Sequence, residues 1–234
     1  MTPQETVERA LAAARSDDCV VIADEVSSAN LRWAANSLTT DGVARGRQLT
    51  VIAITHGGDG TRAGVVSRAG VREDRVTDVV AAAEQAARQS SPVEEAQPLL
   101  GPSDPAAFGV KEAPEPGLPG WDDEPDSTGI GVFAEFSRAL AEAFQTAAAA
   151  GRKLYGYASH SLTSTFLGTS TGLRLRLLDG RTLAGGLLRR GDHPRYLVLA
   201  HAGPGHHAGP GAVAAPGDRD DGELPAPGHA VGGQ

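Results

Sequence analysis

Hydrophobic and polar positions alternate with a period of two over residues 29–36. Leu31 and Trp33 fall on one side of this alternation, which is typical of a half-buried strand. Asp41-Gly42 follows and predicts a tight turn, because glycine tolerates the backbone conformation that a reversal needs. The apolar, β-branched run over 48–55 then predicts a second, buried strand.

Helical spacing of apolar positions predicts three helices, over residues 2–15, 71–89 and 131–150. Thr2 and Glu5 have the spacing of a capping box at the start of the first helix. Ser127 and Thr128 are expected to cap the third helix, and Gly151 to end it. The strands predicted before the second helix form an antiparallel meander, over residues 19–22, 29–36, 48–55 and 63–67.

The second half of the chain changes character twice. Residues 91–126 are rich in Pro, Gly, Asp and Glu, which predicts an acidic linker or a long loop, with a lid over a cleft as the alternative. Residues 127–177 contain the third helix and further strands, predicted over 155–160, 162–167 and 173–177. Residues 178–234 lack a sustained period and are loaded with Gly, Pro, Ala and His, which predicts a disordered tail. The abrupt change suggests a shifted reading frame. The predicted fold class is therefore α+β, an antiparallel sheet with three helices and a disordered C-terminal tail.

Composition narrows the function classes. The chain has 234 residues, 4% aromatic residues and a formal charge of -8, so charge gives no reason to expect binding to nucleic acid or to an anionic membrane. Cys19 is the only cysteine, which excludes an internal disulfide. The N-terminus has no apolar signal segment, and no apolar run reaches the roughly 20 residues that span a bilayer. We therefore expect a cytoplasmic protein.

Two separated patches of sequence carry a family resemblance. The first is the phrase NLRWAANSLTTDGV from Asn30 to Val43. The second combines GVFAEF, LYGYASH and STGLRLR, in that order, between Gly131 and Arg176. Together they resemble the N-terminal domain of the TldD/PmbA family, metallopeptidase-related proteins that are also called modulators of DNA gyrase. The resemblance implies cytoplasmic proteolysis or maturation of peptides, with a second family subunit as partner and a peptide as substrate.

What the resemblance implies about catalysis is limited. The active family members are zinc peptidases that hold the metal with an H-E-x-x-x-H helix in the C-terminal half, whereas PmbA/TldE-type members lack that motif and act as the partner subunit. This chain contains no His-Glu pair, so it supplies no catalytic residue, no metal ligand and no cofactor of its own. We expect it to be the N-terminal portion of such a protein and to be inactive alone. The alternatives are a non-catalytic partner subunit and a nonfunctional gene remnant.

Candidate binding residues lie on the last predicted strands. Arg174 and Arg176 share one strand face, which is either solvated or lines a groove for a partner or an extended peptide. Thr163, Thr165 and Ser170 would supply neutral hydrogen bonds to such a peptide.

Other patterns favour a structural role. Asp126, His160 and Ser170 have the residue types of a hydrolase triad, but no G-x-S-x-G elbow surrounds the serine. The glycines at 57–60 predict a hairpin turn rather than a phosphate loop, since no G-K-[ST] follows. The tail imidazoles of His201, His206 and His207 lack the rigid surroundings that a metal centre requires.

Overall fold

The structure is a computed structural model that describes residues 1–94, 96–103, 120–190 and 193–202. Within these ranges six strands form one sheet in the order β3-β2-β1-β4-β5-β6, and all neighbours are antiparallel. The predicted α+β fold is confirmed. In chain order the elements are α1 (Pro3–Ala13), β1 (Asp18–Ala34), β2 (Ser37–Gly57), β3 (Gly60–Ala69), η1 (Glu73–Arg75), α2 (Val76–Gln89), η3 (Ile130–Phe133), α3 (Ala134–Ala149), β4 (Lys153–Thr169), β5 (Arg174–Arg190) and β6 (His193–Ala202).

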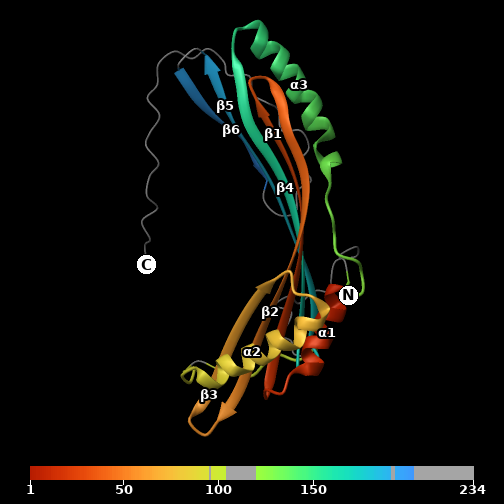
Figure 1. The fold of residues 1–234 in the computed structure, drawn as a ribbon, viewed down its shortest axis with the longest axis vertical. Coiled ribbons are helices and arrows are strands. Elements are labelled where there is room, and N and C mark those ends of the chain that lie inside the picture. Colours follow the sequence, from red (N-terminus) through yellow and green to blue (C-terminus); the bar gives the residue numbers. More distant parts are fainter. Residues whose placement is uncertain (95, 104–119, 191–192, 203–234) are drawn as a thin grey trace.

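The molecule is elongated because the central strands are long and twisted (Figure 1). β1, β2 and β3 form an antiparallel meander of three strands where four were predicted, and β4, β5 and β6 form a second meander that joins the first where β4 pairs with β1. Helices α1 and α2 lie at one end of the sheet and α3 lies at the other (Figure 1).

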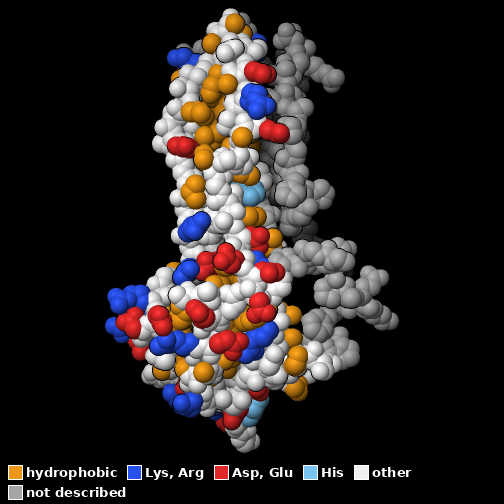
Figure 2. All heavy atoms as spheres, turned by 90° about the vertical axis from the view of Figure 1, so that its right-hand side faces the viewer, with side chains coloured by type: hydrophobic (Ala, Val, Ile, Leu, Met, Phe, Trp, Pro, Cys, Tyr) orange, Lys and Arg blue, Asp and Glu red, His pale blue; other side chains and the backbone are white. Residues whose placement is uncertain are grey.

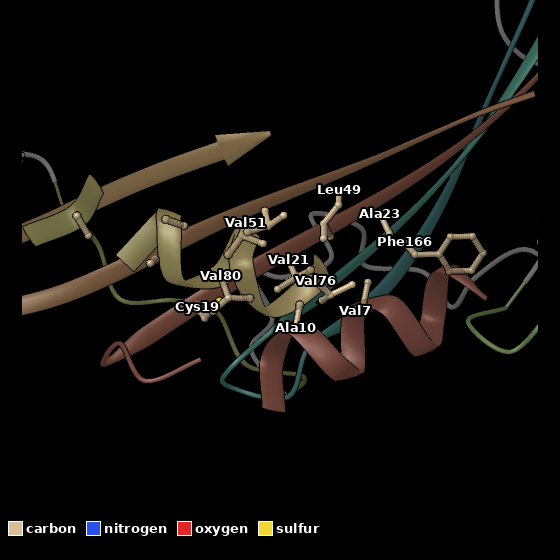
Figure 3. Packing of buried hydrophobic residues seen from close by; sticks show 14 residues of the cluster. Val7, Ala10, Cys19, Val21, Ala23, Leu49, Val51, Val76, Val80 and Phe166 are labelled. Atoms are coloured by element: carbon tan, nitrogen blue, oxygen red, sulfur yellow. The ribbon is translucent and has the colours of Figure 1, made fainter. Parts of the chain in front are cut away.

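Two separate hydrophobic clusters hold these helices on the same face of the sheet. The first cluster packs α1 and α2 on β1, β2 and β4 around Val7, Val21, Val51, Val80 and Phe166 (Figure 3). The second packs η3 and α3 on β1 and β4 around buried aromatic and aliphatic side chains, including Trp33, Phe133 and Leu140. Burial of this apolar surface is the main driving force for the fold.

Two glycines let the helices of the first cluster approach the sheet. A Cβ atom at Gly64 of β3 would lie 2.2 Å from the backbone nitrogen of Ala87 in α2. A Cβ atom at Gly168 of β4 would lie 2.5 Å from Cγ1 of Val7 in α1. Both positions therefore require the residue without a side chain.

The strands predicted over 19–22 and 29–36 are wrong as separate elements, because β1 runs without interruption from Asp18 to Ala34. Those predicted over 155–160 and 162–167 likewise belong to the single strand β4. Polar residues in the middle of each strand concealed the continuity. Two of them, Ser27 of β1 and Ser164 of β4, are nevertheless buried, because hydroxyl hydrogen bonds compensate for their burial.

The turn predicted at Asp41-Gly42 is also wrong. The chain reverses at Ala35 and Asn36, which both have positive φ angles of 52° and 65°, and Asp41-Gly42 lies inside β2. Asn36 tolerates this conformation, and its amide fixes the turn to the start of β4 by accepting from the Leu154 backbone N–H and donating to the Arg152 carbonyl. The turn predicted over 57–60 is confirmed by the pairing of Gly57 with Gly60.

The caps predicted for the helix ends are confirmed in part. The Thr2–Glu5 capping box is present, and Gly151 follows α3 with a φ of 65°. Ser127 and Thr128 do not cap α3, because a 3-10 turn, η3, precedes it and no side chain caps either element. The hydroxyl of Thr128 instead contacts the ring of His160.

The boundary predicted at residue 178 is wrong, because β5 continues to Arg190 and pairs with β4 over most of its length. β6 follows, so backbone that we expected to be irregular lies in the sheet. The sequence of these strands does not alternate regularly between apolar and polar residues, since glycines and leucines that prove to be exposed interrupt the pattern. The tail prediction for 203–234 lies outside the described residues.

Candidate functional site

Residues 120–128, called the strap below, cross the helix-bearing face of the sheet and are hydrogen-bonded to three strands and to α1. The strap follows residues 104–119, which lie outside the described residues, and leads into η3. It contacts β1 at Ser27, β4 at Ser164 and β5 at Arg176. By strand register, Ser27 and Ser164 fall between the two hydrophobic clusters, and Arg176 pairs with Phe166 of the first cluster.

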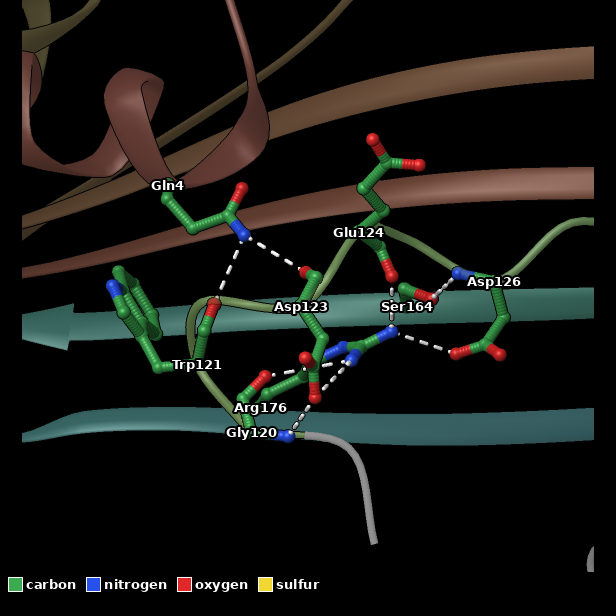
Figure 4. Close-up of polar contacts among 8 residues, drawn as sticks. All are labelled: Gln4, Gly120, Trp121, Asp123, Glu124, Asp126, Ser164 and Arg176. Carbon is green, nitrogen blue, oxygen red and sulfur yellow. Dashed lines mark hydrogen bonds and ion pairs between the residues drawn. The ribbon is translucent and has the colours of Figure 1, made fainter.

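Arg176 is the centre of the strap contacts (Figure 4). Its side chain is only 2% exposed, and Nη2 donates at 2.7 Å both to the carbonyl of Glu124 and to Oδ2 of Asp126. Nη1 donates to the carbonyl of Gly120 at 3.4 Å. The guanidinium carbon lies 5.3 Å from the ring centroid of Phe166, which adds a cation–π contact. The solvated alternative is therefore wrong for Arg176.

Two buried serines hold the far side of the strap. The backbone N–H of Asp126 donates to Oγ of Ser164 at 2.9 Å, and Ser164 is fully buried. The backbone N–H of Thr128 donates to Oγ of Ser27 at 2.9 Å, and that hydroxyl donates back to the Thr128 carbonyl. In a regular helix or sheet, backbone groups bond to one another. In the irregular strap, the two serine hydroxyls instead bond to the N–H groups of Asp126 and Thr128 and to the Thr128 carbonyl.

Helix α1 fixes the beginning of the strap. The side-chain amide of Gln4 donates to the carbonyls of Trp121 and Asp123, at 2.9 and 3.0 Å. The Trp121 ring packs edge-on against Phe166, with 5.7 Å between centroids. The strap thus ties the N-terminal helix to β4 and β5, which are distant in sequence.

Arg174 lies beside the strap but is bound by α1. Its Nε and Nη2 atoms donate to the two carboxylate oxygens of Glu8 at 2.6 and 2.9 Å. These hydrogen bonds lower the pKa of Glu8, although partial burial opposes the change. A lowered carboxyl pKa means that the contact stabilises the fold above the usual pKa of a glutamate and is lost as the pH falls through the folded value.

A second polar cluster lies at Asp18, the first residue of β1. Asp18 accepts from Oγ of Ser170 at 3.0 Å, and its other carboxylate oxygen lies 3.1 Å from Nε2 of His56. Ser170 also accepts from the backbone N–H of Cys19. Because the carboxylate stands between serine and histidine, the imidazole is not placed to take the serine proton, and nucleophilic catalysis by this cluster is disfavoured.

The five predicted binding residues do not share one surface. Arg174 and Arg176 lie on the helix-bearing face, whereas Thr165 lies on the opposite face, where its hydroxyl donates to Asp24 of β1. Thr163 has the same strand parity as Thr165, and Ser170 belongs to the Asp18 cluster. Their role in peptide or partner binding stays a prediction. Sequence reasoning missed the strap as a unit, because its anchors come from four separate elements.

The triad residue types occupy separate networks. Asp126 binds Arg176, Ser170 binds Asp18, and the ring of His160 contacts Thr128. In the described part of the chain no group of three or more His, Cys, Asp or Glu side chains is placed to hold a metal ion. Of the three tail histidines, His201 lies in β6, and His206 and His207 lie outside the described residues. Within the described ranges, every helix is too short or too polar to cross a bilayer.

Cys19 is chemically protected. It is 1% exposed, and burial, assisted by the nearby carboxylates of Glu84 and Asp18, raises its pKa to about 11. We expect the native thiol to resist iodoacetamide near pH 8 and to react in denaturant. Thiol titration with and without denaturant checks this expectation, and rapid labelling of the native protein would contradict it.

The raised pKa of Cys19 also affects stability. Because the folded pKa lies above the unfolded one, the free energy of unfolding should fall as the pH rises from about 9 towards about 11.

Comparison with known proteins adds to this geometry. No family model and no curated protein matches the sequence. Among solved structures, TldE from Thermococcus kodakarensis matches 82% of this chain with a TM-score of 0.58 and 14% identity. The chain has a TldE-like fold.

Two further structures share the TldE-like fold, and both are described as proposed modulators of DNA gyrase. The protein from Bacteroides thetaiotaomicron matches 83% of the chain with a TM-score of 0.53, and that from Thermotoga maritima matches 82% with a TM-score of 0.51. Each is 14% identical to this chain. The chain spans about two fifths of the length of these structures, since the covered shares are 40%, 41% and 42%.

Proposed function

We propose that the chain is the N-terminal portion of a TldD/PmbA-type protein and acts in cytoplasmic proteolysis or peptide maturation as an assembly and binding module. The observation that carries the proposal is the TldE-like fold over 82% of the chain. It coincides with the two sequence patches that resemble the family. One patch lies in the β1–β2 hairpin, and the three segments of the other lie in η3 and the start of α3, in β4, and at the start of β5.

The module supplies no hydrolytic chemistry of its own in this proposal. A zinc peptidase of this family needs two imidazoles one helical turn apart and a glutamate that polarises the bound water. No histidine of the chain is followed by a glutamate. Asp126 and Ser170, the polar residues that most resemble catalytic groups, are engaged in structural contacts. Hydrolysis therefore belongs to a zinc-bearing second subunit or to a C-terminal half.

A non-catalytic subunit of the TldE type is the second candidate function. The similarity to a solved TldE favours it. In both candidates the zinc motif belongs to a second subunit or to a C-terminal half, whereas a gene remnant requires neither.

Co-purification tests the proposal. The full chain should elute together with a zinc-bearing TldD/PmbA-family protein from the same genome, and peptide turnover should depend on that protein. Arg174→Ala should weaken the complex if the predicted binding role is correct, and Arg181→Ala, which removes an arginine that is 72% exposed, serves as the matched control. Separate elution of the two folded proteins would contradict the proposal.

A further inference from the structure

The half of β2 nearest the hairpin turn at Ala35 and Asn36 forms an open edge of the sheet. β3 pairs with β2 only from Gln48 onward, whereas β1 pairs with β2 between Ser37 and Ile54. Residues 38–47 of β2 thus have a strand on one side only within the described chain. Helix α3 packs on β1 and β4, and η3 also contacts β2. An exposed edge of this length is a ready template for another strand.

The hydrogen-bonding groups of this edge point outward at alternate residues. The carbonyls of Gly42 and Ala44 accept from side chains of β1, so they face β1. The carbonyl of Arg47 accepts from the Gly70 N–H on the other side of β2. By the alternation of an antiparallel strand, Asp41, Val43 and Arg45 direct both their N–H and C=O groups away from β1.

The side chains at these three outward positions are mutually complementary about Val43. When a two-fold axis passes midway between Val43 and its copy, the two valines face each other, and Asp41 of each chain faces Arg45 of the other. All three side chains are exposed, with Val43 at 51%, and neither Asp41 nor Arg45 makes an ion pair in the described chain. Opposed hydrogen-bonded residues lie about 5.5 Å apart, within reach of an ion pair.

We propose that the edge around Val43 binds a second copy of this chain by antiparallel strand addition. Three opposed residue pairs supply about six backbone hydrogen bonds, because each pair exchanges two. The two Asp41–Arg45 contacts fix the register, and the interface is isologous, as a two-fold dimer requires. Leu38 of β2 and Val132 of η3 are exposed as well, and Figure 2 shows further exposed hydrophobic side chains on the half of the molecule that carries α3. The inference goes beyond the proposed function and does not rest on it.

Charge exchange tests this interface. Sedimentation of the wild-type chain should show a concentration-dependent dimer. Asp41→Arg should place four positive charges at the interface and Arg45→Asp four negative ones, so each should raise the dimer dissociation constant at least about tenfold. The double variant Asp41→Arg/Arg45→Asp should restore it to within about threefold, because both pairs are complementary again.

Mixing the two single variants gives the sharpest result. Each should sediment as a monomer alone, and an equimolar mixture should form a one-to-one dimer, an outcome that a folding defect cannot produce. Arg138→Asp, the same charge change at an exposed position of α3, should leave the dimer unchanged. Circular dichroism at a chain concentration below the wild-type dissociation constant should give equal melting temperatures for all variants. A wild-type chain that stays monomeric, including one whose edge captures an extended peptide instead, or a dimer indifferent to these charges, would overturn the proposal.

Discussion

Replacing Arg176 by alanine is expected to lower the free energy of unfolding by about 3 kcal/mol. The substitution removes a buried guanidinium and leaves the Glu124 carbonyl and the Asp126 carboxylate without their donor. Breaking a buried ion pair on one side costs about 3–5 kcal/mol, and the Asp126 side chain, at 38% exposed, recovers part of this through water. Urea denaturation measures the change.

The same variant should release the strap. Limited proteolysis should cut within 120–128 faster than in the wild type, since the strap loses the group that holds it against β5. Arg181→Ala is the matched control on the same strand, because its ion pair with Asp179 is solvent-exposed and should contribute less than about 0.5 kcal/mol. Equal stability of the two variants would mean that Arg176 does not organise the strap.

Replacing Gly64 by alanine is expected to lower the free energy of unfolding by about 3 kcal/mol. The new methyl group would lie 2.2 Å from the Ala87 nitrogen and 2.3 Å from the Ala83 carbonyl oxygen, and both atoms belong to the backbone of α2. Helix α2 must therefore move away from β3, which opens the first hydrophobic cluster. Thermal unfolding followed by circular dichroism measures the loss.

Gly58→Ala is the matched control for this prediction. Gly58 lies in the same hairpin, and a Cβ atom there would meet nothing within 4 Å. Its melting temperature should stay close to that of the wild type. A Gly64→Ala protein as stable as the control would show that the close approach of α2 to β3 is not needed.

Local patterns in the sequence predicted which helices and strands form better than they predicted where each one begins and ends. The apolar stripes of α1 and α2 and the Thr2–Glu5 box predicted helices correctly, because these signals act within a few residues. The turn at Ala35 and Asn36 was missed because Asp-Gly is the stronger local turn signal, whereas the contacts of Asn36 with β4 come from residues more than 100 positions away. Long-range partners of this kind cannot be read from spacing.

For the candidate site too, the sequence predicted local features but not long-range contacts. The strand period placed Arg174 and Arg176 correctly on one face of β5. It gave no indication that Arg176 would be 2% exposed, because the strap that covers it is irregular and acidic and has no period. Burial of Ser27 and Ser164 was equally hidden, since a hydroxyl enters the interior only where another segment supplies its hydrogen bonds.

Peptide hydrolysis and zinc content of the purified full chain test the proposed division of labour most directly. With zinc supplied, the chain alone should retain less than stoichiometric metal after dialysis and should leave an unstructured peptide intact, because it has no pair of imidazoles one helical turn apart beside a glutamate. Cleavage should begin only when a zinc-bearing family subunit is added. Stoichiometric zinc together with peptide cleavage by the chain alone would contradict the account.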